Sequence, residues 1–315
     1  MTNNRKEFTR RDFIHVGGAM AACSLLPSPI MKVFAAPGPA DIHFGYASIT
    51  WDGKDRQAIE DISALGFPGI QLRANAIAEF DNNPAVLREL LDAHKLKMVA
   101  LSSGNLDTEN PADTEIAAHL ARAQFAKGAG AIYLQVIGAR PKGRAPVRED
   151  YKKMGELLME LSKRTLDIGV QVGFHNHMGF LAERPEEVDW IFEGTDPRYA
   201  KLELDVAHCV QGGGDPVKMM TKYSDRLLFM HLKDVRTVTP PPAPAGSTAT
   251  PKNYQFVELG RGRVDFPAIF AGMAKIKYRG WAIVELDAVP DPAQTPKECA
   301  EISKKYLADK LGYKI

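Results

Sequence analysis

Phe229-Met230-His231-Leu232-Lys233-Asp234 is an apolar run that ends in polar residues, as expected of a buried β-strand where it reaches the edge of a sheet. Three further apolar runs end in residue types that bind metals, and those residues are His175, Asp205 and Glu285. Together with His231 they lie about 26 to 54 positions apart, which is at least the length of a strand plus a helix. In a barrel of such units, the C-terminal ends of the strands meet at one mouth. The pattern therefore predicts that the four side chains share one site.

From residue 41 onward, apolar strand-like runs alternate with amphipathic segments of helical period. The predicted strands are Ile42–Ala47, Gly69–Arg73, Lys97–Leu101, Ala131–Val136, Val170–Phe174, Ala200–Asp205, Leu227–Leu232 and Ala282–Glu285. The predicted helices are Asp55–Leu65, Pro84–His94, Pro111–Gly128, Arg148–Ile168, Pro185–Phe192, Pro216–Tyr223, Pro267–Lys275 and Pro296–Leu311. Strict alternation predicts one α/β domain, a (β/α)8 TIM barrel over residues 41–315. An open doubly wound sheet is the alternative, but such a sheet gathers its site at a single crevice.

Length and charge limit the possible functions. The chain has 315 residues, of which 45% are hydrophobic and 25% are charged, as in ordinary globular proteins. A barrel of this kind needs roughly 250 residues, so little chain is left for a second domain. The net charge of +1 gives no reason to expect nucleic acid or an anionic membrane surface as a partner. We expect a small-molecule substrate, and a homodimer is compatible with these data.

The first 36 residues have the features of an export signal. Arg10 and Arg11 precede an apolar run from Phe13 to Leu26, which is shorter than the ~20 residues that span a bilayer. Small residues around Ala35 suit a signal peptidase. This arrangement resembles a twin-arginine (Tat) signal, so we expect a periplasmic protein that is exported folded and is not integral to the membrane. A basic amphipathic helix is the alternative.

The three cysteines are relevant to the predicted export. Cys23 follows Met20-Ala21-Ala22, an imperfect lipobox, so lipid anchoring at Cys23 is a second alternative. After cleavage only Cys209 and Cys299 remain. The periplasm would permit a disulfide between them, but two distant cysteines do not form a scaffold.

One segment interrupts the alternation of strands and helices. Val235–Phe256 contains the run Thr239-Pro240-Pro241-Pro242-Ala243-Pro244, and proline lacks the amide hydrogen that regular structure needs. We therefore expect an irregular loop. Because it follows the seventh predicted strand, it should lie over the site as a lid or contact surface, with a solvated excursion as the alternative.

The four residues at the strand ends match a divalent cation in ligand type and charge. His175, Asp205, His231 and Glu285 are expected to bind Mn, Co, Mg or Zn. Ionised carboxylates are rarely buried without a partner, which favours metal binding for the two acidic residues. The alternatives are that Asp205 caps the helical turn after it and that Glu285 forms an ion pair at the rim of the barrel.

Neighbouring residues are assigned to catalysis or substrate binding. Strand alternation places Lys233 on the same face as His231, so its ammonium can reach a substrate oxygen. Glu285 or His177 is the predicted base, and Lys233 or His208 is predicted to hold substrate hydroxyls. The predicted substrate-binding residues are His208, Arg73 and Asp234, of which the last could also orient a metal ligand.

Five motifs occur in a fixed order along the chain. They are His175-Asn176-His177, Leu204-Asp205-x-x-His208, His231-Leu232-Lys233-Asp234, Leu259-Gly260-x-Gly262-x-Val264-Asp265-Phe266 and Val284-Glu285-Leu286-Asp287. Over residues 41–311 this set resembles the xylose isomerase-like TIM barrel superfamily, which holds sugar isomerases and epimerases, inosose and dehydroshikimate dehydratases, and relatives of endonuclease IV. The ordered set is specific to the superfamily and not to one reaction.

The resemblance carries implications for single residues. In the isomerase and epimerase members, Glu, Asp, His and Glu from strands 5 to 8 hold a metal, and the last three correspond to Asp205, His231 and Glu285. His175 stands where many relatives have Glu, with His177 as the competing ligand. In the epimerases of this superfamily, the glutamates of strands 5 and 8 also act as the acid/base pair. With His175 in the first of these positions, such a two-glutamate mechanism is not expected here.

Together these features predict a divalent-metal-dependent sugar isomerase or epimerase that removes the proton α to a carbonyl and stabilises the resulting enediolate. Loss of a β leaving group from the same enediolate would give a lyase or dehydratase acting on 3-keto-glycosides or inosose-like substrates. A sugar-binding protein without catalysis is a third interpretation. Export argues against a phosphosugar substrate, because phosphorylated sugars are cytosolic.

Overall fold

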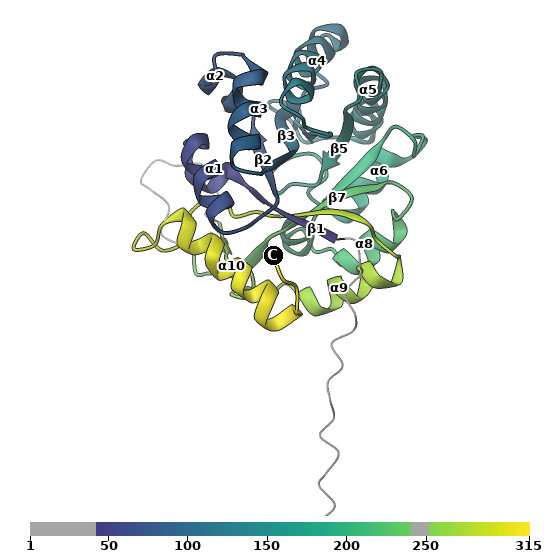
Figure 1. Cartoon of the computed structure of the whole chain (residues 1–315). Coiled ribbons are helices and arrows are strands. Elements are labelled where there is room, and N and C mark those ends of the chain that lie inside the picture. Colours follow the sequence, from purple (N-terminus) through teal and green to yellow (C-terminus); the bar gives the residue numbers. More distant parts are fainter. Residues whose placement is uncertain (1–41, 241–251) are drawn as a thin grey trace, which may run out of the picture. The chain divides into compact units, whose positions relative to one another are not determined.

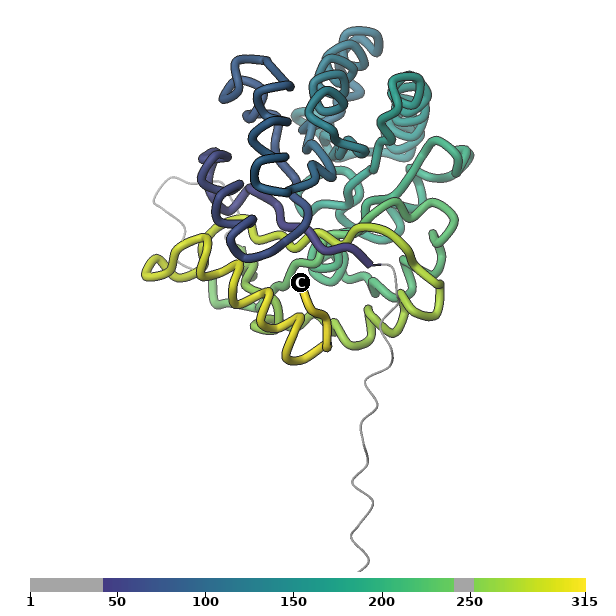
Figure 2. The backbone as a smooth tube through the Cα atoms, viewed as in Figure 1, coloured from purple at the N-terminus to yellow at the C-terminus, as the bar shows by residue number. Residues whose placement is uncertain are grey.

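Eight parallel strands close into a barrel in the computed structural model, which describes residues 42–240 and 252–315 (Figure 1). The barrel strands are β1 (Ile42–Ala47), β2 (Gly69–Arg73), β3 (Lys97–Leu106), β4 (Tyr133–Gly138), β5 (Gln171–His175), β6 (Lys201–Asp205), β7 (Leu227–Leu232) and β10 (Gly280–Val284). Strand β1 pairs with both β2 and β10, so the sheet has no edge there and is not the open sheet considered above (Figure 2). The predicted (β/α)8 barrel is confirmed.

The eight predicted helices all form, with ends within one or two residues of the predicted ones. They are α1 (Asp55–Ala64), α3 (Pro84–Ala93), α4 (Ala112–Gly128), α5 (Arg148–Asp167), α6 (Pro185–Phe192), α8 (Pro216–Lys222), α9 (Phe266–Lys275) and α10 (Pro296–Leu311). Three short helices were not predicted, and they are η1 (Ser48–Trp51), α2 (Asn75–Glu79) and α7 (Val206–Gln211). Asn83 and Asp215 accept backbone N–H bonds at the starts of α3 and α8, each followed by proline.

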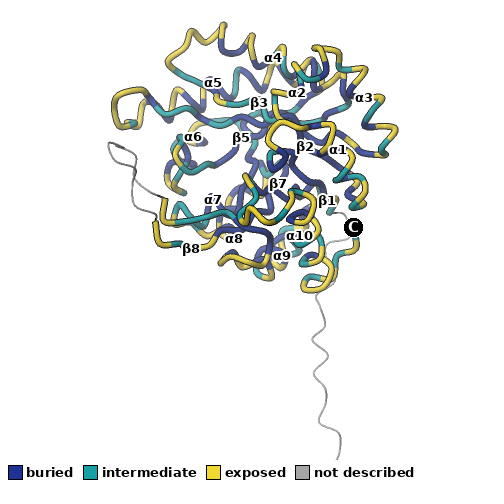
Figure 3. The backbone as a smooth tube through the Cα atoms, turned by 90° about the vertical axis from the view of Figure 1, so that its left-hand side faces the viewer, coloured by how far each residue is buried: buried dark blue, intermediate teal, exposed yellow. Residues whose placement is uncertain are grey.

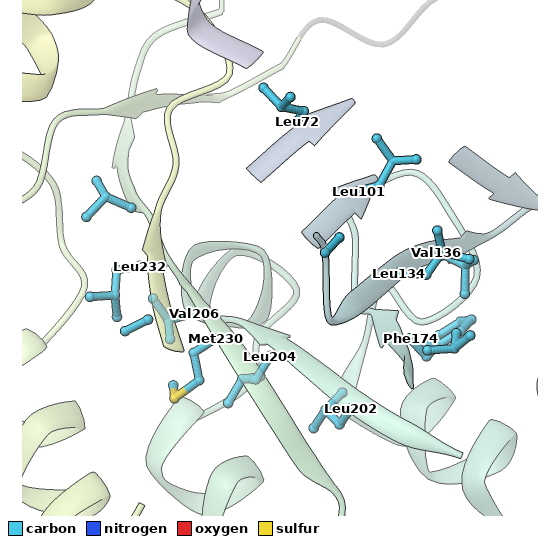
Figure 4. Close-up of a cluster of buried hydrophobic side chains, with 14 of the residues drawn as sticks. Leu72, Leu101, Leu134, Val136, Phe174, Leu202, Leu204, Val206, Met230 and Leu232 are labelled. Carbon is cyan, nitrogen blue, oxygen red and sulfur yellow. The ribbon is translucent and has the colours of Figure 1, made fainter. Parts of the chain in front are cut away.

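Strand alternation separates an outer apolar layer from a polar interior. Leu202, Leu204 and Leu232 belong to the core between strands and helices and are fully buried (Figure 4). Burial of one leucine stabilises the fold by about 1.5–3 kcal/mol. Their neighbours Glu203 and His231 therefore face the barrel axis. Figure 3, coloured by burial, shows buried strands inside and exposed stretches on the helices.

An apolar plug fills the part of the barrel interior beneath this polar layer. It consists of Ala47, Val99, Ala100, Phe229, Trp281 and Ile283. Phe229 stacks on Tyr133 with ring centroids 5.1 Å apart, and it precedes His231 by two positions on the same face of β7. The plug keeps water away from the inner side of the polar layer.

The segment after β7 differs from the prediction of an irregular loop over Val235–Phe256. Strands β8 (Asp234–Thr237) and β9 (Tyr254–Val257) form an antiparallel pair, because these flanks contain no proline and can exchange backbone hydrogen bonds. The proline run falls mostly within 241–251, outside the described residues. The predicted export signal, with Cys23, also lies outside them.

Two further observations concern the permitted disulfide and the possibility of a membrane-spanning helix. Cys209 and Cys299 are both buried as free thiols, so the permitted disulfide is not formed. Among the described residues, no helix has the length and apolar character needed to cross a membrane.

Candidate metal centre

The four ligand-type residues converge at the C-terminal ends of their strands. His175 and Asp205 end β5 and β6, His231 lies near the end of β7, and Glu285 directly follows β10. Each offers a nitrogen or oxygen atom, and these atoms all lie within 4.8 Å of one another. All four residues are buried. The geometry therefore brings together the residues that the sequence pattern placed at one mouth.

His231 lies between carboxylates on both of its ring nitrogens. Its Nδ1 is 3.0 Å from Glu285 Oε2 and 3.7 Å from Asp205 Oδ2, while its Nε2 is 2.6 Å from Glu203 Oε1. Burial alone would lower the pKa of His231, but Glu203 and Glu285 raise this pKa well above its ordinary value. In the absence of a cation, a proton on this imidazole offsets the surrounding negative charge.

Asp205 has two roles, one for each carboxylate oxygen. Oδ1 accepts a hydrogen bond of 2.8 Å from the backbone N–H of His208 and so caps α7, as the structural alternative predicted. Oδ2 faces His231. The Asn176 side chain accepts from the Asp205 N–H and donates to its carbonyl, which fixes β5 against β6. Capping and metal binding are therefore compatible at this residue.

Three buried polar atoms of the cluster have no hydrogen-bond partner among the described residues. They are His175 Nδ1, Asp205 Oδ2 and His231 Nδ1. Buried polar atoms without a partner cost free energy, and a cation between them would supply the missing partner. Two imidazoles and two carboxylates suit zinc and other divalent first-row metals. The residues present thus fit a divalent metal, although they do not fix which ion.

The other imidazoles near the cluster are neutral. Burial, with His231 nearby, lowers the pKa of His175 well below its ordinary value. Burial and the Lys233 ammonium lower the pKa of His208 in the same way. A neutral imidazole keeps the lone pair that a metal ligand needs.

Lys233 is buried among acidic groups. Its Nζ lies 2.9 Å from Glu285 Oε2 and also forms an ion pair with Asp287. Burial would lower the pKa of Lys233, but Asp287 and Glu285 raise it above its ordinary value, so the ammonium stays charged. The ring of Phe256, from β9, packs 4.4 Å from Nζ and closes this side of the centre. Lys233 was predicted to reach a substrate oxygen, but in this arrangement two carboxylates and Phe256 surround its ammonium.

A cavity of about 340 Å³ opens beside the four residues. Of the predicted site residues, Arg73, His175, His177 and Glu285 line it. Unpredicted lining residues include Asn75, Gln135, Asn105, Phe180 and Asp287. The mixture of amide, charged and apolar groups suits a small polar ligand with an apolar face.

The rings of His177 and His208 pack with centroids 3.8 Å apart and planes tilted by 34°, and of the two residues His177 lines the cavity. His177 Nδ1 lies 2.7 Å from the carbonyl oxygen of Met178. A carbonyl can only accept, so Nδ1 carries the proton and Nε2 keeps a lone pair. His208 was predicted to contact substrate, and it is 1% exposed with the His177 ring beside it.

Asp234, which was predicted to bind substrate, is engaged within the fold instead of facing the cavity. Asp234 is fully buried, and both carboxylate oxygens accept backbone N–H bonds. The donors are the amides of Val235, Gly260, Gly262 and Val264. Its function is to hold the turn after β9. The motif Gly260-x-Gly262 has a local reason here, because a Cβ at Gly262 would lie 2.2 Å from Asp234 Oδ1.

Two of the unpredicted residues of the site are acidic. Glu203, in the middle of β6, touches His231 from beneath, and Asp287 pairs with Lys233. Each lies two positions from a predicted ligand, Asp205 or Glu285, and alternation puts it on the same face. The spacing of two positions from a predicted ligand could therefore have identified both residues from the sequence.

Comparison with known proteins places this fold and site in a family. The chain belongs to the xylose isomerase-like TIM barrel family, whose model matches residues 59–306. Inosose dehydratase of Lacticaseibacillus casei is 28% identical over 292 residues, covering 84% of this chain and 96% of that protein. The rhizopine catabolism protein MocC of Rhizobium meliloti is 30% identical over 290 residues, covering 82% and 86% of the two chains.

Solved structures support the same fold. A crystal structure described as IOLI protein with a binding zinc atom superposes with a TM-score of 0.70 at 19% identity, over 85% of this chain and 98% of that one. A sugar phosphate isomerase/epimerase from Parabacteroides distasonis gives a TM-score of 0.63 at 18% identity, over 87% and 96% of the two chains. At these identities the likeness concerns the fold alone.

Proposed function

We propose that this protein is a divalent-metal-dependent lyase that removes water from a cyclic polyol carrying a carbonyl group, the class of substrate called an inosose. The observation that carries the proposal is the convergence of His175, Asp205, His231 and Glu285 beside a polar cavity. Similarity to inosose dehydratases over most of both chains favours the lyase alternative over the isomerase or epimerase expected first.

The cavity also gives a physical reason to prefer elimination over epimerisation. Epimerisation needs groups that exchange protons on both faces of one carbon, as in a pair of opposed glutamates. Here β5 ends in the imidazole of His175, and the two carboxylates that line the cavity, Glu285 and Asp287, both follow β10. Elimination needs only one base that can return its proton to the leaving oxygen.

His177 is the base that the geometry favours. Its Nδ1–H is held by the Met178 carbonyl, so Nε2 can take the proton from the carbon next to the substrate carbonyl. As that C–H bond breaks, a C=C bond forms and the C–O bond of the β-hydroxyl breaks. The same Nε2 then returns the proton to the departing hydroxide, which leaves as water, and His177 is regenerated. Glu285, paired with Lys233 and His231, is less available as a base.

The metal would be held by the four converging residues and would act as a Lewis acid on the substrate carbonyl and its neighbouring hydroxyl. Lys233 keeps Glu285 ionised and in place by its ion pair. Arg73 and Asn105, at the cavity wall, are suited to hold outer hydroxyl groups. Exclusion of water by Phe256 and the apolar plug strengthens each of these electrostatic contacts.

The test is incubation of zinc- or manganese-loaded protein with an inosose, a 3-keto-glycoside and a free ketose, followed by NMR and mass spectrometry. The proposal predicts a product of the inosose that has lost one water. A product of unchanged mass would indicate isomerisation or epimerisation and would overturn the proposal. Glu285→Gln separates an enzyme from a sugar-binding protein, because an enzyme loses turnover whereas a binding protein can keep its affinity.

A further inference from the structure

Glu203 takes no part in the chemistry described so far, yet it occupies a costly position. It lies in the middle of β6 and is fully buried, facing the barrel axis one layer below Asp205. Barrel interiors are mostly filled by branched apolar side chains. A carboxylate in such a place destabilises the fold unless other groups compensate for its lost hydration. Its contacts indicate what that compensation is.

All close contacts of Glu203 are made by one oxygen. Oε1 lies 2.6 Å from His231 Nε2, accepts a hydrogen bond of 3.2 Å from Gln135 Nε2, and is 3.7 Å from His175 Nδ1. Its closest contact is thus a ring nitrogen of one residue of the metal cluster. Glu203 itself is not one of the four residues whose ligand atoms converge.

Gln71 and Gln135 fix the direction of these bonds. Gln71 Nε2 donates to Gln135 Oε1 over 3.0 Å, so Gln71 Oε1 is the atom that lies 2.9 Å from His231 Nε2. Gln71 Oε1, and Glu203 Oε1 in the ionised carboxylate, can only accept hydrogen bonds from this nitrogen. The proton of a neutral His231 therefore sits on Nε2, and the lone pair sits on Nδ1.

His231 Nδ1 is the nitrogen that faces the other members of the cluster. It lies 3.0 Å from Glu285 Oε2 and 3.7 Å from Asp205 Oδ2, and it has no hydrogen-bond partner among the described residues. A carboxylate on the far nitrogen of a metal-binding histidine fixes the ring, selects the tautomer and strengthens the donor nitrogen.

We propose that Glu203 is a positioning residue of the metal centre, which acts through His231 and sets the affinity for the divalent ion. Gln71 and Gln135 hold it in place. The proposal rests on the proposed function only in requiring that the four residues bind a metal. It concerns the strength of metal binding and not the reaction, so the two can be tested separately.

The first experiment is Glu203→Gln, which keeps the size of the side chain but removes its charge. Zinc affinity is measured by competition with a chromophoric chelator. We expect the affinity to fall about 10- to 100-fold. The thermal midpoint of the metal-free variant is measured alongside, so that a loss of zinc affinity can be compared with any change in the stability of the fold. A residue of purely structural importance would lower that midpoint and leave zinc affinity unchanged, which would overturn the proposal.

Glu258→Gln is the matched control. Glu258 is also a buried carboxylate, 1% exposed, with one oxygen paired to Arg261 and the other without a partner among the described residues. It does not belong to the metal cluster. Zinc affinity of this variant should equal that of the wild type. An equal loss in both variants would contradict a specific role for Glu203.

A second measurement needs no variant. In zinc-loaded wild-type protein with ¹⁵N-labelled histidine, NMR should find the proton of His231 on Nε2 and the metal on Nδ1. The opposite arrangement would overturn the proposal. Lower zinc affinity of Glu203→Gln without any lyase turnover in the wild type would refute the proposed function alone. Unchanged affinity in an active lyase would refute only the role of Glu203.

Discussion

The Lys233 ammonium lies 2.9 Å from the Glu285 carboxylate, and both groups are buried. The ion pair joins the end of β7 to the residue after β10, so two neighbouring strands are connected where the proposed metal binds. Asp287 pairs with the same ammonium. The net effect is that one cation holds the two carboxylates of the β10 end in fixed positions beside the cavity.

Lys233 does not contact substrate in this account, but its replacement should still impair turnover because it holds the two carboxylates. Lys233→Met leaves Glu285 and Asp287 to repel each other, and we expect turnover to fall about 10- to 100-fold, as for other groups that orient metal ligands. Steady-state kinetics on the inosose substrate measure this. Lys201→Met is the control, because Lys201 lies at the opposite end of β6, where it donates to the Asp225 carbonyl, and should not affect turnover. Equal turnover in both variants would contradict the role given to Lys233.

Variants of Asp205 should separate its two roles. Asn at this position can still cap α7, whereas Ala cannot, so Asp205→Ala should be about 1 kcal/mol less stable than Asp205→Asn in metal-free urea unfolding. Both variants should bind zinc much more weakly than the wild type, since each lacks the charged Oδ2. If the Asn variant kept wild-type zinc affinity, Asp205 would be a helix cap and nothing more.

His119 should make stability depend on pH. In the neutral ring, Nε2–H donates to the Asn105 carbonyl over 3.0 Å and Nδ1 accepts from Ser103 over 2.6 Å, which joins α4 to the irregular part of β3. Burial and Arg122 lower the pKa of His119 from its ordinary 6.5. The unfolded chain therefore takes up a proton as pH falls through 6.5 before the folded protein does, and stability is lost in that range.

The variant His119→Gln should show a smaller loss of stability between neutral pH and pH values below about 6.5 than the wild type. Metal-free protein is used for both, with the free energy of unfolding measured in urea at each pH. The difference between the two curves gives the contribution of His119 to the pH dependence, separate from that of the other histidines. Parallel curves would show that His119 does not contribute to the pH dependence.

Export remains a proposal, since the residues concerned lie outside those described. We propose that Arg10 and Arg11 direct the chain to the twin-arginine route. Replacing both with lysine should leave unprocessed protein in the cytoplasm, as seen by cell fractionation. Replacing Cys23 with alanine should leave export and membrane release unchanged, whereas a lipid anchor would be lost with it. Normal export of the double-lysine variant would contradict the proposal.

The positions of the four ligand-type residues could be predicted because each closes an apolar run of strand length. The order of apolar runs and amphipathic segments predicted alternating strands and helices. In a closed barrel of such units, the C-terminal ends of the strands must meet. Asp205 was predicted as a ligand or as a cap, and the structure shows that one carboxylate oxygen caps α7 while the other faces His231, so the two roles are compatible.

Other features depend on contacts between distant segments, which a single sequence does not display. Asp234 looked like a site residue because it follows Lys233, but the turn at 260–264 folds back and takes up both of its oxygens. Glu203 could be placed on the inner face of β6, whereas its contact with His231 follows from the register of β6 against β7. The pairing of β8 with β9 was hidden by the prolines between them.

The most direct test of the account is the position of a bound metal. A crystal structure of zinc-loaded protein, with anomalous data at the zinc edge, should show one strong peak per chain at ~2.0–2.2 Å from atoms of His175, Asp205, His231 and Glu285. A peak elsewhere, or full zinc loading with these four side chains turned away from the ion, would contradict the central claim.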